Sequence, residues 1–98
     1  MSPTDAKNVF DLGARVGSLE GYLYVGKDVE ANYLPGWLEN IERQFHGLTP
    51  EVRKVCVEGF YEVMRKVAAY LQHLYGEQDE NTRRAKAILA DVHRELAG

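Results

Sequence analysis

The amino-acid sequence predicts an all-α fold, a small antiparallel bundle of about four helices. Apolar residues recur at alternating spacings of three and four, and glycines and capping residues divide the chain into four such stretches. No segment alternates apolar and polar residues over the length of a strand. The chain has 98 residues, 45% of them hydrophobic, which suffices for one core, so we expect a single helical-bundle domain over residues 1–98.

The first helix is expected from about Thr4 to about Val25. Its apolar side carries residues at helical spacing, namely Val9, Leu12, Val16, Leu19 and Leu23. Gly26 is expected to end this helix, because glycine adopts the left-handed conformation of a helix C-terminus without strain. Asp28 can then begin the next helix by accepting hydrogen bonds from its free amides.

The second helical stretch runs from Val29 to Gly47 and contains a proline. Its apolar residues are Val29, Tyr33, Leu34, Trp37, Leu38, Ile41 and Phe45. Pro35 lacks an amide hydrogen, so it disrupts a helix interior but suits the first helical position. Two alternatives follow: a helix kinked near Pro35, or a short helix followed by a second one that starts at Pro35.

The third helix has the clearest start in the chain. Thr49 can cap it, Pro50 suits its first position, and Glu51 interacts favourably with the helix dipole. We expect it to run to about Tyr75. Its apolar side is wide and comprises Val52, Cys56, Val57, Phe60, Val63, Met64, Val67, Tyr70, Leu71 and Leu74. So wide an apolar side predicts a central helix.

The fourth helix follows Gly76 and is expected to be capped by Asp79. Its apolar stripe is narrower, as in an outer helix, and comprises Ala85, Ile88, Leu89, Val92 and Leu96. Short connections favour antiparallel neighbours, so the helices should run up, down, up and down. The sequence leaves open whether this last helix packs on its own chain or on a second copy.

Charge and cysteine content exclude several functional classes. The formal net charge is −3, and the basic residues are scattered, with the densest group at Arg83, Arg84 and Lys86. Nucleic acid and anionic membrane surfaces are therefore not expected partners. A single cysteine, Cys56, and the lack of a secretory pattern at the N-terminus predict a cytoplasmic protein. The apolar runs are too short to cross a bilayer.

No catalytic residue, cofactor or metal ligand is predicted. The three histidines, His46, His73 and His93, are expected on solvent-facing sides without a clear set of metal-ligand partners. Glu58 and Glu62 are four residues apart but project away from the apolar side, where Lys66 is a candidate partner, and the Glu-x-x-His motif of di-metal bundles is absent. No nucleophile motif or phosphate-binding loop occurs.

Three glycines four residues apart, Gly13, Gly17 and Gly21, stand out within the first helix. Each glycine in a helix interior costs about 0.8–1 kcal/mol relative to alanine, so we expect packing to offset the cost. The main interpretation is close packing against another helix or aromatic rings of the same chain, with the closest approach at Gly17. The second interpretation is a subunit interface or ligand groove.

An aromatic cluster surrounds the junction of the first two helices. It comprises Tyr22, Tyr24, Tyr33 and Trp37. Tyrosine and tryptophan combine an apolar body with a polar tip, which suits either the edge of a core or a partner interface.

Glu20 lies between the apolar stripe and the glycines of the first helix. We therefore expect it to be partly buried. Burying a carboxylate is costly without a bonding partner, and the candidate partners are Lys66 and Tyr70 on the third helix.

These observations predict a non-enzymatic protein-interaction or assembly module, a homodimer joined at the first helix or the aromatic junction. The alternative is a small-ligand or metal-binding bundle with a pocket under the junction aromatics. An enzyme subunit that contributes no catalytic residue would have the same sequence features. The candidate binding residues are Gly13, Gly17, Gly21, Glu20, Tyr24, Tyr33 and Trp37.

Overall fold

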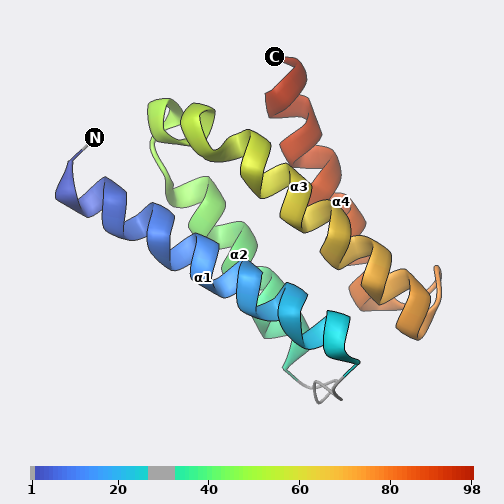
Figure 1. The fold of residues 1–98 in the computed structure, drawn as a ribbon. Coiled ribbons are helices and arrows are strands. Elements are labelled where there is room, and N and C mark those ends of the chain that lie inside the picture. Colours follow the sequence, from blue (N-terminus) through green and yellow to red (C-terminus); the bar gives the residue numbers. More distant parts are fainter. Residues whose placement is uncertain (1, 27–32) are drawn as a thin grey trace.

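A computed structural model describes residues 2–26 and 33–98, and this part of the chain is helical with no strand. The helices are α1 (Pro3–Val25), α2 (Leu34–Gly47), α3 (Pro50–Tyr75) and α4 (Glu80–Ala97) (Figure 1). The predicted all-α bundle of four helices is confirmed. The expected helix start at Asp28 and the apolar residue Val29 lie outside the described residues.

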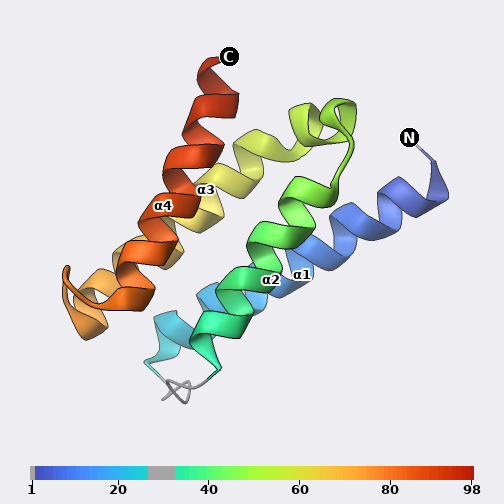
Figure 2. The ribbon, with the colours of Figure 1, turned by 180° about the vertical axis from the view of Figure 1, so that it is seen from behind.

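The four helices form two layers. α1 and α3 lie in one layer and run in the same direction, while α2 and α4 lie in the other and run the opposite way (Figures 1 and 2). Consecutive helices are therefore antiparallel, as predicted. The most extensive contacts join α3 to α4 and to α1, and smaller ones join α2 to α1 and to α4. α4 thus packs within its own chain.

The helix ends follow the predicted capping signals at two places. Gly26 adopts the left-handed conformation, with φ 71°, directly after α1. The Asp79 carboxylate accepts hydrogen bonds from two amides in the first turn of α4. A capping box between Ser2 and Asp5 at the start of α1 was not predicted.

The start of α3 differs in one detail from the prediction. Thr49 occupies the capping position in an extended conformation and Pro50 the first helical position, but the Thr49 side chain makes no capping hydrogen bond. Its carbonyl instead accepts the amide of Arg53 at 2.9 Å. The helix start is confirmed, and the expected side-chain cap is wrong.

Pro35 lies in the first turn of α2, which begins at Leu34 and continues without interruption to Gly47. The first-turn amides of a helix have no partner within it, so the missing proline donor costs no hydrogen bond there. Of the two alternatives, the described residues favour a helix that starts at the proline.

All four helices contribute to one core. The rings of Phe45 and Phe60 stack within it with centroids 4.6 Å apart. Leu74 and Leu96, predicted on apolar faces, are partly exposed, and each lies in the last turn of its helix. The buried apolar residues are Leu12, Val16, Leu19, Leu23, Leu34, Leu38, Ile41, Phe45, Leu48, Val52, Val57, Phe60, Met64, Val67, Ala68, Leu71, Ala85, Ile88 and Val92.

Thr82 is the one buried polar residue in the core of the described part, and sequence analysis did not predict it. Its amide donates to the Asp79 carboxylate, but its hydroxyl has no hydrogen-bond partner within residues 2–26 and 33–98. A buried hydroxyl without a partner costs free energy, because folding removes it from water.

We predict that Thr82→Val raises the free energy of unfolding by about 1–2 kcal/mol, because valine keeps the shape and removes the unpaired hydroxyl. Thr82→Ser is the matched control. It keeps the hydroxyl and loses a buried methyl group, so it should lower stability by about 1 kcal/mol. Urea denaturation of the three proteins measures both changes, and a valine variant no more stable than the native chain would contradict the account.

Candidate functional site

The glycines of α1 are open within the single chain. A Cβ atom added at Gly13, Gly17 or Gly21 would meet no neighbouring atom within 4 Å. The predicted close packing, with its closest approach at Gly17, is therefore wrong for the chain by itself. The physical reason is that α2 and α3 pack against the side of α1 that carries its buried leucines and valine, and the glycines lie on another side.

The glycines belong to a longer apolar side of α1. Phe10, Gly13, Gly17, Gly21 and Tyr24 follow one another at spacings of three and four, and we call them the glycine face. Phe10 and Tyr24 are each 73% exposed. Large exposed aromatics on one side of a helix are typical of an interaction surface.

A shallow hollow of about 160 Å³ extends this face towards α3. Gly13 and Gly59 lie on opposite sides of it and leave it unfilled, since neither has a side chain. The remaining residues around it are apolar or weakly polar, namely Val9, Leu12, Val16, Cys56, Phe60 and Val63. The outer surface of the α1–α3 layer is therefore apolar and indented.

Glu20 is partly buried, as predicted. Within residues 2–26 and 33–98, however, no hydrogen bond or ion pair joins it to Lys66 or Tyr70. The proposed partners are wrong, because Lys66 is exposed and the Tyr70 ring lies against Tyr24, with centroids 6.0 Å apart. Glu20 is thus a carboxylate at the edge of the glycine face.

The aromatic cluster is divided among different neighbours. The indole Nε1 of Trp37 donates to the Arg15 carbonyl at 3.1 Å, and the Trp37 ring meets Tyr22 edge-on with centroids 5.8 Å apart. Trp37 and Tyr22 therefore join α1 to α2. Tyr24 lies near α3, and Tyr33 is exposed at the start of α2. Within residues 2–26 and 33–98, Trp37 and Tyr22 border different hollows. The hollow beside Trp37 is open and has Asp11, Ala14, Arg15, Ser18 and Gln44 around it.

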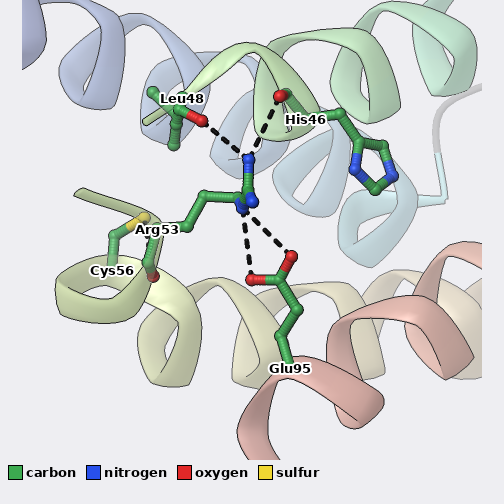
Figure 3. A network of polar contacts seen from close by, with 5 residues as sticks. All are labelled: His46, Leu48, Arg53, Cys56 and Glu95. Atoms are coloured by element: carbon green, nitrogen blue, oxygen red, sulfur yellow. Dashed lines mark hydrogen bonds and ion pairs between the residues drawn. The ribbon is translucent and has the colours of Figure 1, made fainter. Parts of the chain in front are cut away.

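A polar network centred on Arg53 joins three helices at one end of the bundle (Figure 3). The guanidinium donates to the carbonyls of Leu48 at 2.7 Å and His46 at 3.2 Å, which lie at the end of α2. It also forms an ion pair with Glu95 of α4 at 3.0 Å. The side chains of Arg53 and Glu95 are only 20% and 32% exposed, so water screens this pair less than a surface pair.

Cys56 lies beside this network, on the side of α3 that faces α1. Its Sγ donates to the Arg53 carbonyl at 3.7 Å. Burial raises the pKa of the Cys56 thiol. The thiol therefore stays protonated and weakly nucleophilic at neutral pH, as is usual for a cysteine on the apolar side of a helix.

One group of side chains was not predicted from the sequence. A carboxylate oxygen of Glu42, a ring nitrogen of His46 and a carboxylate oxygen of Asp91 all lie within 4.8 Å of one another. Glu42 and His46 are four residues apart, which the helical pattern could have revealed. Asp91 joins them only because α4 packs on α2, and no sequence pattern gives that contact.

His46, His73 and His93 are exposed, as predicted. For His46 the expected lack of metal-ligand partners is wrong, because Glu42 and Asp91 lie beside it. Glu58 and Glu62 are exposed as well, and Glu62 pairs with Arg65 at 3.0 Å rather than with Lys66.

No family model, curated protein or solved structure matches this chain. Among the described residues, none of the helices combines the length and the apolar character that a membrane span requires.

We predict that Arg53→Ala lowers the free energy of unfolding by about 2–3 kcal/mol, since charge-assisted hydrogen bonds to partly buried acceptors are lost together. Arg43→Ala is the matched control. Arg43 pairs with Glu39 at 2.8 Å on the exposed surface of α2, and such a pair contributes about 0.5 kcal/mol or less. Urea denaturation measures both changes in the free energy of unfolding. Equal decreases would show that the Arg53 network contributes no more than an exposed surface pair.

Proposed function

We propose that the chain is a non-enzymatic assembly module that pairs with a second copy of itself through the glycine face of α1. The observation that carries the proposal is the symmetry of this face about Gly17. Phe10 and Tyr24 lie seven residues on either side of Gly17, and Gly13 and Gly21 lie four residues on either side. A face with this order is complementary to itself when turned end for end.

An antiparallel pair of α1 helices crossing at Gly17 uses this symmetry. A two-fold axis through Gly17 places Phe10 against Tyr24 of the partner subunit, and Gly13 against Gly21 of the partner subunit. Phe10 and Tyr24 are about 21 Å apart along the helix, given a rise of about 1.5 Å per residue. The pair therefore has an aromatic contact at each end and two glycine-lined backbones between them.

Charge does not oppose this arrangement. Glu20 stands at the edge of the glycine face, and the same two-fold axis places it at the level of Ala14 of the partner subunit. Like charges therefore do not meet across the pair. Helix axes normally lie about 8–10 Å apart, and glycines allow a closer approach with more dispersion contacts.

The three glycines of α1 carry an energetic cost. Together they cost about 2–3 kcal/mol relative to alanine, and the single chain offers no contact at their open side. Pairing offsets this cost by burying the backbone and the exposed aromatics. We expect the pair to form in the cytoplasm, where the single Cys56 stays a thiol.

We predict a mass twice that of one chain in sedimentation equilibrium at tens of micromolar. Gly17→Leu should give the monomer mass, because a leucine at the crossing point holds the two backbones apart. Ala87→Leu is the control, since it adds a comparable side chain at an exposed position of α4 in the other layer. A native protein that is monomeric, or a Gly17→Leu variant that pairs normally, would refute the proposal.

Gly17→Ala should have opposite effects on the single chain and on the pair. In a dilute, monomeric sample it should raise the free energy of unfolding by about 1 kcal/mol, because the position is open and alanine favours the helix. In the concentrated, paired sample the added methyl group should weaken association. Measuring the free energy of unfolding at a low and a high protein concentration tests both effects. Stabilisation of equal size at both concentrations would contradict the interface.

The register is tested by disulfide formation in a Cys56→Ala background. Gly17→Cys should give a covalent dimer on mild oxidation, because the two copies of residue 17 meet at the axis. Ala6→Cys, towards one end of α1, should stay monomeric, since the antiparallel arrangement keeps its two copies far apart. A parallel pair would cross-link both variants and would overturn this geometry.

A further inference from the structure

Two helices of the other layer bring metal-ligating side chains together. Glu42 and His46 lie one turn apart near the end of α2, so they project from the same side of that helix. Asp91 of α4 faces them. One ligand atom from each of the three residues lies within 4.8 Å of the other two.

The three ligand atoms suit a borderline divalent ion. Imidazole nitrogen and carboxylate oxygen are ligands of Zn²⁺ and its neighbours, at metal–ligand distances of about 2.0–2.2 Å. Adjacent ligands of a tetrahedral ion are then about 3.3 Å apart, so the side chains must close by on the order of 1.5 Å. His46 is exposed and Glu42 and Asp91 only partly buried, so rotation about their side-chain bonds allows this closure.

The charges around the cluster also favour a cation. Glu42 is partly buried, and no basic side chain within residues 2–26 and 33–98 forms an ion pair with it. Its carboxylate faces that of Asp91, which has one partner, Arg94, on its own helix. The Arg94 side chain is largely exposed and can turn into water when an ion replaces it. A divalent cation neutralises both carboxylates at once.

The Arg53 network supports the helices that supply these ligands. Its guanidinium holds the His46 carbonyl and the carboxylate of Glu95, which lies one turn beyond Asp91 on α4. The His46 ring extends away from the guanidinium (Figure 3). The backbones of both ligand-bearing helices are therefore fixed while the imidazole stays available, as a metal site requires of its surroundings.

We propose that Glu42, His46 and Asp91 bind one divalent transition-metal ion of the zinc class between α2 and α4. Three protein ligands leave at least one coordination position for water, which is typical of exchangeable sites rather than closed structural ones. The site lies in the layer opposite the glycine face, so binding does not depend on self-association.

The test is calorimetric titration of the full chain with Zn²⁺, free of affinity tag and chelator. We expect saturation at one ion per chain. Glu42→Gln, His46→Gln and Asp91→Asn keep the side-chain size, and each should weaken binding by about tenfold or more. His73→Gln is the matched control, an exposed histidine of α3 outside the cluster, and should bind within about twofold of the native chain.

Further measurements separate a specific site from surface binding. Binding should weaken on acidification, because a protonated imidazole cannot act as a ligand. Circular dichroism of each variant shows whether its helices are intact, and the Gly17→Leu variant should bind Zn²⁺ as the native chain does. The proposal would be overturned if the native chain showed no saturable Zn²⁺ binding, or if none of the three cluster variants weakened binding. It would also be overturned if His73→Gln weakened binding as much as the cluster variants do.

Discussion

The wide apolar side of α3 is the constraint on which the rest of the structure depends. It buries side chains towards both α1 and α4, so these two helices settle on either side of it and α2 closes the second layer. Because α1 uses its leucine and valine side for these contacts, its glycine face remains outside the bundle. Because α4 packs antiparallel to α3 and beside α2, Asp91 lies next to Glu42 and His46.

Apolar packing alone does not fix how far one helix slides along another. At one end of the bundle, the directional hydrogen bonds of Arg53 fix this position. A planar guanidinium can donate several hydrogen bonds at fixed angles. Here it donates to two carbonyls at the end of α2 and to the carboxylate of Glu95. The carbonyls of His46 and Leu48 at that helix end are thereby satisfied, and the relative heights of α2, α3 and α4 are set together.

The sequence predicts local features well because their causes are local. Gly26 and Asp79 act within one helical turn, and the four apolar stripes required no knowledge of their neighbours. The predicted close packing of Gly17 within the chain was wrong because helical spacing shows which residues share a side of a helix and not what covers that side. The cluster with Asp91 needed the contact between α2 and α4, and the unpaired hydroxyl of Thr82 likewise depends on tertiary packing.

The two layers of the bundle present surfaces of different chemistry. The outer side of α1 has a patch with small residues and aromatics and one carboxylate at its edge, and its order repeats when read in reverse about Gly17. Such a surface offers few groups that could bond a charged or small polar ligand. Its two-fold order suits the proposed pairing with a second copy. The contact of α2 with α4 offers an imidazole and two carboxylates, which suit a cation and would oppose apolar contact. Because different helices carry these two surfaces, a substitution at either one should leave the chemistry of the other intact.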